Sequence, residues 1–502
     1  MKKQPNIKLN FLYNISYQIL LVITPLLVAP YISRVLGDDN IGTYSYTYSM
    51  AHYFAVFCML GVSHHGNRTI AVCRDDQDRL NQTFSEITTL KFLISAIVLS
   101  AYAIYVGLIA DESYRLYSVL QVFYILSFVL DIHWFFAGLE EFKVTVMRLL
   151  IIKVLSMICI FSFVKTADDL WIYTLIMSGS FLISEVYLWI VARKRVKWKL
   201  PRLKDALKHL KPILVLFIPI LAVDLYRMMD KIMLGEIISM GSVGQYENAD
   251  KIIKICLGVV TALSSVMLPR MAKLNAENDT GTMRRYMGNS MRVILAMSCA
   301  LVAGILAVGK TFAPTFFGPE FVECGSVLQV LSFSVLFVAF SNLVRTQYLI
   351  PCHKDRIYIL AVWGGVALNL VLNILLIPWL GAIGAAIATA VTELLVSIIQ
   401  AICVWKSLPM GVFFKNLLAY GVIGAVMFVA VKAVGWIPIP GELGWLPIPN
   451  AGTILILVLQ VVIGAIVYLS LVAIYLWITD RELIRSAGKS AKRILKKLHL
   501  VH

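Results

Sequence analysis

The amino-acid sequence predicts an all-α polytopic membrane protein with about fourteen transmembrane helices, and three observations support this class. Of the 502 residues, 59% are hydrophobic and only 15% are charged, and the mean hydropathy is +0.81. Apolar runs of about 20 residues, the length that crosses a bilayer, recur along the chain. Basic residues gather in every second segment between these runs, as in proteins that cross a membrane repeatedly.

Each predicted span lies between polar residues, glycine or proline. The first run follows Lys2, Lys3 and Lys8 and lacks a small-residue cleavage site, so we expect a first membrane helix rather than a signal peptide. The predicted spans are residues 9–33, 41–63, 87–109, 117–137, 149–164, 170–192, 212–236, 245–268, 287–309, 326–350, 358–377, 381–405, 416–436 and 451–478. The 8 cysteines form no CxxC motif and most lie in apolar runs, so we predict neither a disulfide framework nor a metal site.

The distribution of Lys and Arg predicts the orientation. With the N-terminus inside, inner segments hold 32 of the 45 basic residues and outer loops hold 4. We therefore expect both termini on the cytoplasmic side of the membrane. The net charge of +16 then faces anionic membrane lipids of the inner leaflet, and nucleic acid is not implied as a partner.

A basic segment and a weak internal repeat predict the domain organisation. The sequence RKRVKWKLPRLKDALKHLK, residues 193–211, follows the sixth span. Leu36-Gly37 and Ile41-Gly42-Thr43-Tyr44 in the first half recur as Leu234-Gly235 and Val243-Gly244-Gln245-Tyr246 in the second. We predict a six-helix lobe at 1–192, a cytoplasmic linker at 193–211, a second six-helix lobe at 212–405, two extra helices at 406–478 and a basic tail at 479–502.

The densest charges within lipid-like sequence lie between Asp224 and Lys254. Asp224, Arg227, Asp230 and Lys231 share one side of a helix, within an arc of about 120°, and Glu247, Asp250, Lys251 and Lys254 share an arc of about 100° on the next. Charge at bilayer depth normally faces a bundle interior or a watery cavity, which favours a substrate path. The alternative is that these acids and bases only neutralise one another as structural pairs.

Other charged residues within spans have two interpretations each. Lys91, Lys153, Arg292, Arg345 and Lys432 lie near a predicted boundary, which favours snorkelling over a role in a cavity. Asp131, Glu185 and Glu393 have no basic residue one turn away on their own helix. Each of these acids is either a proton or ion site or a buried acid that is paired with another helix.

Enzymatic function is not predicted. Residues 304–311, GILAVGKT, match the phosphate-loop pattern. A phosphate loop needs a preceding strand and an exposed turn, whereas this run ends an apolar span, so we reject the match. H-E-x-x-H and G-x-S-x-G motifs are absent from the sequence, and no outer loop is long enough for a catalytic domain.

Four segments carry a resemblance to a known family: PYISRVLGDDNIGTYSYTYSMAHYFAVFCMLGVSHHGNRTIA, DIHWFFAGLEEFK, MDKIMLGEIISMGSVGQYENADKI and LGAIGAAIATAVTE. The chain resembles bacterial polysaccharide repeat-unit flippases (Wzx-type), over nearly its whole length. Their superfamily also contains multidrug exporters and the peptidoglycan-precursor flippase. One departure is His64-His65, where the family often has a tyrosine.

The resemblance implies a V-shaped bundle of MATE-like fold that works by alternating access. It implies a location in a bacterial cytoplasmic membrane and export of an undecaprenyl-pyrophosphate-linked oligosaccharide repeat unit from the inner to the outer leaflet of that membrane, for capsule, exopolysaccharide or O-antigen synthesis. Polysaccharide polymerase machinery is a candidate partner. No cofactor is implied, and a proton or sodium gradient is a candidate energy source. The alternative is a cation-coupled drug or metabolite antiporter on the same scaffold, which would need an unpaired acid in a mostly apolar cavity.

A pyrophosphate cargo requires cations along its path, because arginine and lysine bind phosphate oxygens. The cations that we expect to bind the substrate are Arg34, Arg227, Lys231, Lys251, Lys254, Arg345 and Arg68, and the acids that we expect to form a latch or couple an ion are Asp224, Asp230, Asp250, Glu247 and Glu393. In the latch hypothesis, the acids hold the cations near the outer side until the arriving pyrophosphate competes for them.

Overall fold

A computed structural model describes residues 7–437 and 451–479, and regular structure in these ranges is helical. The α-helices are α1 (Ile7–Met59), α2 (Val62–Cys73), α3 (Gln77–Ile104), α4 (Glu112–Leu120), α5 (Val122–Leu130), α6 (His133–Gly138), α7 (Phe142–Phe163), α8 (Leu170–Ala192), α9 (Leu203–Leu207), α10 (Leu210–Ile237), α11 (Met240–Ala276), α12 (Thr280–Phe317), α13 (Val322–Val344), α14 (Asp355–Val404), α15 (Met410–Val434) and α16 (Ala451–Thr479). Tyr105–Ile109 and Arg345–Leu349 are π-helical turns, and Ala167–Asp169 is a 3-10 helix.

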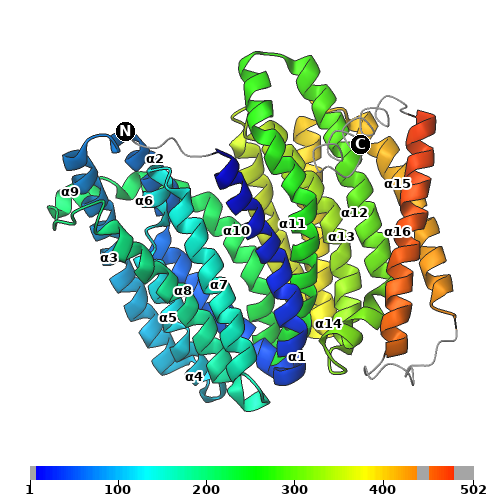
Figure 1. Cartoon of the computed structure of the whole chain (residues 1–502), viewed down its shortest axis with the longest axis horizontal. Helices are drawn as coiled ribbons and strands as arrows, with labels where there is room; N and C mark the ends of the chain where they lie inside the picture. The colour runs from blue at the N-terminus through cyan, green and yellow to red at the C-terminus, as the bar shows by residue number, and fades with distance from the viewer. Residues whose placement is uncertain (1–6, 438–450, 480–502) are drawn as a thin grey trace. The chain divides into compact units, whose positions relative to one another are not determined.

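The chain forms two compact units, which are described separately (Figure 1). The first unit contains residues 1–251, 317–321 and 359–392, and the second contains residues 252–316, 322–358 and 393–502. The described residues contain 11 helical stretches that are long and apolar enough to cross a membrane. The all-α membrane class is therefore confirmed, whereas the number fourteen and the predicted domain boundaries stay predictions.

Two long helices each contain two predicted spans. The 53-residue α1 covers 9–33 and the part of 41–63 up to Met59, and the chain leaves helical geometry at Gly37, which has a φ of 78°. The 50-residue α14 covers 358–377 and nearly all of 381–405, with its break at Gly381, which has a φ of 54°. Glycine adopts this left-handed region without the steric cost that a side chain would add. The break at Gly37 therefore falls between two predicted spans, and the break at Gly381 falls at the first residue of the predicted span 381–405.

The predicted span 117–137 is not one continuous helix. It is divided among α4, α5 and α6, and the second break lies at Asp131. There the side chain of Asp131 accepts a hydrogen bond of 2.7 Å from the backbone N–H of His133, and its carbonyl accepts from the buried ammonium of Lys91. The indole of Trp189 donates to the carbonyl of Leu130 over 2.7 Å. Side chains from α3 and α8 thus satisfy the carbonyls that the break exposes.

Helices α11 and α12 extend beyond the predicted spans 245–268 and 287–309. They contain 37 and 38 residues, against the roughly 20 that a bilayer requires. The added turns carry charges that lower the local hydropathy, yet Met271, Met283 and Met287 are buried in one cluster within the second unit. Packing of these methionines therefore continues the helices where hydropathy alone predicted their ends.

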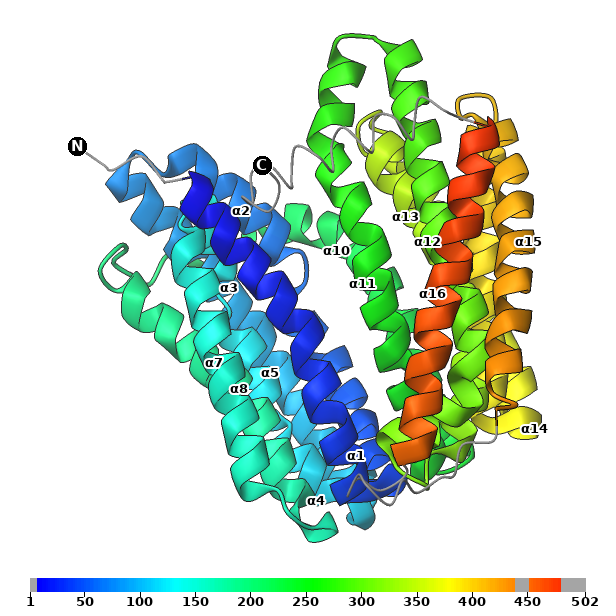
Figure 2. The same cartoon turned by 45° about the vertical axis from the view of Figure 1, so that its right-hand side comes forward.

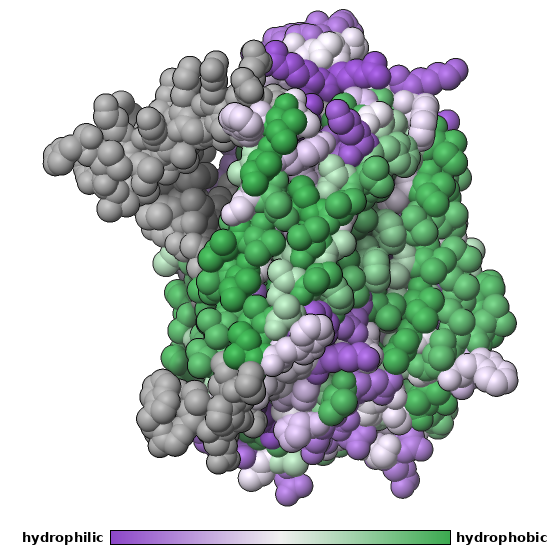
Figure 3. Space-filling view, turned by 90° about the vertical axis from the view of Figure 1, so that its right-hand side faces the viewer, coloured by the Kyte–Doolittle hydropathy of each residue, from purple (hydrophilic) through white to green (hydrophobic). Residues whose placement is uncertain are grey.

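The second unit also contains α13, α15 and α16. Helices α15 and α16 lie side by side in both views (Figure 1 and Figure 2), with Gly464 of α16 packed against Val431 of α15. The hydroxyl of Tyr468 on α16 donates to the carbonyl of Ala296 on α12 over 2.7 Å. Figure 3 shows a face on which hydrophobic side chains form a broad band between hydrophilic ends, as expected of a surface that contacts lipid.

Candidate functional site

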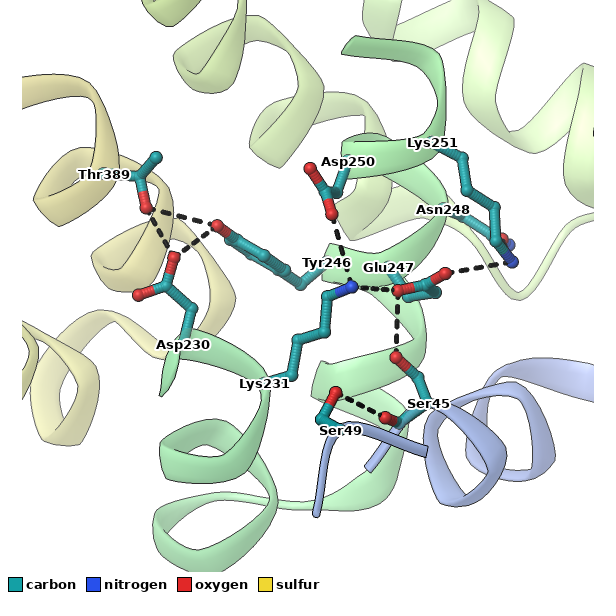
Figure 4. A network of polar contacts seen from close by, with 10 residues as sticks. All are labelled: Ser45, Ser49, Asp230, Lys231, Tyr246, Glu247, Asn248, Asp250, Lys251 and Thr389. Atoms are coloured by element: carbon teal, nitrogen blue, oxygen red, sulfur yellow. Dashed lines mark hydrogen bonds and ion pairs between the residues drawn. The ribbon is translucent and has the colours of Figure 1, made fainter. Parts of the chain in front are cut away.

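Lys231 on α10 is the centre of a charge cluster in the first unit (Figure 4). Its side chain is buried, and its ammonium lies 2.5 Å from Oε2 of Glu247 and 3.3 Å from Oδ2 of Asp250, both on α11. Glu247 also pairs through Oε1 with Lys251, at 3.4 Å. Two bases and two acids from the predicted stripes are therefore in contact. The sequence predicted that each stripe shares one side of its helix, but not which residues form pairs.

Neutral side chains complete this arrangement, named here the Lys231 cluster (Ser45, Lys231, Glu247, Asp250 and Lys251). The hydroxyl of Ser45 on α1 donates to Oε2 of Glu247 over 2.9 Å. The amide oxygen of Asn248 lies 3.3 Å from the ammonium of Lys251. Every charge in the cluster thus has an opposite charge close by, which offsets the cost of removing it from water.

Asp230 does not join the Lys231 cluster. Adjacent helical residues point about 100° apart, so Asp230 faces other neighbours than Lys231 does. Its Oδ2 accepts hydrogen bonds from Tyr246 (2.6 Å) and Thr389 (2.5 Å), as Figure 4 shows. Its Oδ1 accepts a hydrogen bond from Asn373 (2.7 Å). The side chain of Asp230 is buried among these groups. A buried carboxylate with hydroxyl and amide neighbours offers the chemistry to bind a proton or a hard cation.

The two copies of the internal repeat meet beside the Lys231 cluster. A Cβ atom on Gly42 would lie 1.7 Å from the carbonyl oxygen of Met240, and one on Gly244 would lie 2.1 Å from the carbonyl oxygen of Asp38. Gly42 and Gly244 are equivalent positions of the repeat, and each packs on the backbone just before the other. Gln245 adds a hydrogen bond of 2.8 Å to Oδ2 of Asp38. Such close contact of α1 with the start of α11 is open only to glycine.

Asp224 lies near an aromatic group rather than near another member of its stripe. Its Oδ1 is 3.7 Å from Nε2 of His52 on α1. The other ring nitrogen of His52 lies 2.9 Å from the hydroxyl of Tyr124 on α5, and Tyr53 donates to the carbonyl of Leu225 over 2.6 Å. These contacts tie α10 to α1 and α5 within the first unit.

The remaining predicted cations and Glu393 have varied surroundings. Arg227 on α10 and Arg34 on α1 are exposed, and Gly318 packs close to the side chain of Arg34. Arg68 is exposed on α2, which follows the C-terminal part of α1, where Ser45 lies. In the second unit, Lys254 is exposed, Glu393 is buried, and the guanidinium of Arg345 lies 4.1 Å from the ring centre of Tyr358. The role of each residue stays a prediction.

Glu185 is paired across helices. Its Oε1 lies 2.7 Å from the guanidinium of Arg148 on α7, whose side chain is buried. This contact agrees with the pairing interpretation, one of the two that the sequence left open. Asp131 serves the helix break described above.

Sequence reasoning missed several residues that build the site. Tyr246, Asn373 and Thr389 surround Asp230, and Ser45 contacts Glu247. A signal was available for one group, because Asn369 and Asn373 lie one helical turn apart in an apolar run and are both buried. The hydroxyl residues gave no such signal, since Ser and Thr are common in membrane helices.

Comparisons with known proteins agree with this architecture. The family profile described as "Polysaccharide biosynthesis protein" matches residues 7–275, and that described as "Lipid II flippase MurJ" matches residues 214–440. A "Putative O-antigen transporter" of Shigella dysenteriae is 24% identical over 378 residues, which is 74% of this chain and 93% of that protein.

Two solved structures share the fold. The structure described as "Lipid II flippase MurJ, inward closed conformation" is similar with a TM-score of 0.72 and 14% identity, covering 94% of this chain and 100% of that chain. A multidrug resistance MATE family transporter of the MOP superfamily in an inward-facing conformation gives a TM-score of 0.57 and 14% identity, covering 81% of this chain and 95% of that chain.

Proposed function

The chain belongs to the polysaccharide biosynthesis protein family, and from this premise we propose that it is a flippase for a lipid-linked oligosaccharide. It moves an undecaprenyl-pyrophosphate-linked repeat unit from the inner to the outer leaflet of the cytoplasmic membrane by alternating access. The O-antigen transporter relative and the flippase profile both support this class of cargo. Both termini face the cytoplasm, and a polysaccharide polymerase takes over the flipped unit.

The Lys231 cluster is the observation that carries the proposal. Glu247 on α11 pairs with both Lys231 on α10 and Lys251 on α11, and Asp250 on α11 also pairs with Lys231. A pyrophosphate brings two or more negative charges and competes with carboxylates for the same ammonium groups. Binding of cargo thereby exchanges one set of charge pairs for another, without leaving a buried lysine unpaired.

The acid best suited to ion coupling is Asp230 rather than a member of the Lys231 cluster. Tyr246, Thr389 and Asn373 donate to its carboxylate, so it can take up a proton or a hard cation without breaking an ion pair. This environment also fits the antiporter alternative, which requires such an acid. The family membership favours the flippase, and Asp230 then supplies coupling of cargo movement to a proton or sodium gradient.

The proposed flippase is not an enzyme, and its transport does not use ATP hydrolysis by this chain. The segment that matches the phosphate-loop pattern, 304–311, lies within the continuous helix α12. Its backbone N–H groups are therefore committed to helical hydrogen bonds and cannot cradle a phosphate.

The test is the side of the membrane on which the lipid-linked glycan is found. Cells that lack the chain should accumulate the glycan on the inner leaflet, measured as loss of labelling by a membrane-impermeant glycan-reactive reagent. Native protein should restore labelling, and Lys231→Ala with Lys251→Ala should not. The matched control is Lys273→Ala, because Lys273 is exposed and, among the contacts described, pairs only with Glu277, which directly follows α11. Normal outer labelling without the chain, together with a lost drug efflux, would favour the antiporter.

A further inference from the structure

The start of α10 packs very closely on the N-terminus of α2, within the first unit. A Cβ atom on Gly61 would lie 2.3 Å from the carbonyl oxygen of Ile213 and 2.9 Å from Cβ of Leu216. This contact leaves no room for a side chain at residue 61, so the position of the first turns of α10 depends on their packing against α2. Charged and polar residues beside this contact determine how firmly they are held.

Three titratable side chains form a chain of hydrogen bonds across the same junction. Nε2 of His65 on α2 lies 2.8 Å from Nδ1 of His209, which directly precedes α10. Nε2 of His209 lies 3.0 Å from Oε2 of Glu86 on α3, and Glu86 is 1% exposed. Gln82 donates to Oε1 of Glu86 over 2.8 Å. We call His65, Glu86 and His209 the clasp.

The number of hydrogen-bond donors and acceptors limits which nitrogen atoms of the clasp can carry a proton. An ionised Glu86 only accepts hydrogen bonds, so Nε2 of His209 carries a proton and donates it. Only one proton fits between the facing nitrogens of His65 and His209. With both rings neutral, the N–H of His65 donates to Nδ1 of His209. If both rings were charged, two N–H groups would face each other and the bond would be lost.

The other charged groups at the junction oppose an added proton. Arg68 on α2 acts on His65, and the ammonium of Lys208 lies 2.7 Å from Oε2 of Glu86, where it competes with His209 for the same carboxylate oxygen. Burial, His209 and Arg68 hold the pKa of His65 below its ordinary value of about 6.5. Glu86 is the acidic partner that offsets part of this positive charge.

We propose that the clasp is a proton-binding site that releases the start of α10 from α2 when the surrounding solution is acidified. The bond is lost only when both rings are charged, so the ligand is the second proton that this pair of rings takes up. The site lies at the end of the first unit that the distribution of basic residues predicts to be cytoplasmic. The site is separate from Asp230 and from the Lys231 cluster. It makes the position of α10, the helix that carries Lys231, sensitive to cytoplasmic pH.

The direction in which pH shifts the balance between the clasped and the released form follows from the linkage between protonation and conformation. His65 binds a proton less readily while it is clasped than when it is released into water, so the clasped form is favoured above a pH of about 6.5. That preference is lost as the pH falls, because protons bind the released form more tightly. One proton per clasp changes the ratio of the two forms by at most about tenfold per pH unit.

The experiment measures the distance between α2 and α10 in the full-length protein without cargo. Spin labels are placed at Asn67→Cys and Leu214→Cys, two exposed positions, after replacement of the 8 native cysteines, and the protein is reconstituted in lipid nanodiscs. Pulsed electron paramagnetic resonance should show one short distance between the labels at a pH of about 8. A second, longer distance should become more populated as the pH falls toward about 5.5.

Three variants decide the outcome. His65→Gln keeps an N–H donor toward His209 but cannot titrate, so the short distance should persist at both pH values. His209→Gln serves the same purpose if His65→Gln fails to fold. His64→Gln changes the exposed neighbour and should leave the native response intact. Identical distance distributions of the native protein at both pH values, or a native-like response of His65→Gln, would overturn the proposal. Transport plays no part in this readout, so the result is independent of the proposed flippase function.

Discussion

Lys231 and Asp230 are neighbours in the chain, yet their surroundings give them different roles. Lys231 lies between two carboxylates, whereas Asp230 receives hydrogen bonds from neutral donors. The latch hypothesis includes both Asp230 and Asp250 among its acids, and it stays a prediction. Glu247 and Asp250 contact Lys231, whereas the contacts described for Asp230 are to Tyr246, Thr389 and Asn373. Neutralising a carboxylate therefore has a different expected effect in each case.

At this scale we predict that Glu247→Gln weakens the latch and that Asp230→Asn does not. The ion pair with Lys231 and the contact with Lys251 are lost in Glu247→Gln, and such pairs are worth about 1 to 3 kcal/mol. Labelling of Ser49→Cys by a membrane-impermeant thiol reagent should then become roughly tenfold to a hundredfold faster. Ser49 is buried and hydrogen-bonded to the carbonyl of Ser45. Equal labelling rates in Glu247→Gln and the unaltered background would mean that the pairs are purely structural.

A second residue-scale prediction concerns stability. Lys231→Ala leaves Glu247 and Asp250 without their buried partner, so the free energy of unfolding should fall by about 3 to 5 kcal/mol. Lys273→Ala removes only an exposed pair with Glu277 and should change it by less than about 0.5 kcal/mol. Thermal unfolding in the same lipid or detergent compares the two. A loss in Lys231→Ala no larger than in Lys273→Ala would contradict the prediction.

Helices α1 and α11 meet through two glycines that are equivalent positions of an internal repeat. The reciprocal contacts of Gly42 with Met240 and of Gly244 with Asp38 involve backbone atoms, which cannot move aside as a side chain can. The two copies of the short repeat therefore contact each other, and each copy makes the contact through the glycine at the equivalent position. This explains the glycines without reference to any cargo.

We accordingly predict that Gly42→Ala and Gly244→Ala each destabilise the protein by about 1 to 3 kcal/mol through overpacking. Gly179→Ala on α8 is the matched control, because nothing lies within 4 Å of its added Cβ. Alanine has a higher helix propensity than glycine by about 1 kcal/mol, so the control should be neutral or stabilising. The measurement is the midpoint of thermal unfolding. A native-like midpoint for Gly244→Ala would show that the close contact can relax.

Helix α12 contains the segment that matches the phosphate-loop pattern, and we predict that its lysine is not needed for transport. Lys310 occupies the lysine position of the GILAVGKT match but is exposed near the end of a continuous helix. Lys310→Ala should therefore leave flipping unchanged, as measured by outer-leaflet labelling of the glycan. The protein level is measured in parallel. Lost labelling at a normal protein level would show that the phosphate-loop match has a function after all.

The whole molecule carries its basic residues predominantly in the predicted inner segments, which predicts its topology. Reporter fusions at Asp76, Leu203 and Ser490 should give an inside signal, and fusions at Asp111 and Gly444 an outside signal. Ser490 and Gly444 lie outside the described residues, so fusions test positions that the structure does not address. An inside signal at Gly444 would remove the last helical hairpin from the predicted topology.

The sequence by itself determined the membrane class, the family resemblance and the span boundaries near which the breaks at Gly37 and Gly381 lie. It also determined which charges share one side of a helix. These features depend on hydropathy, on glycine geometry and on the 100° step between residues, all of which are local properties.

Only the tertiary structure decided the partners. The contacts of Lys231 with Glu247, of Asp230 with Asn373 and Thr389, and of His65 with His209 depend on how helices from distant segments are rotated and shifted against one another. The break at Asp131 depends in the same way on Lys91 and Trp189 from other helices. Hydropathy along a single helix is averaged over its circumference and contains no information on which neighbour each side chain will meet.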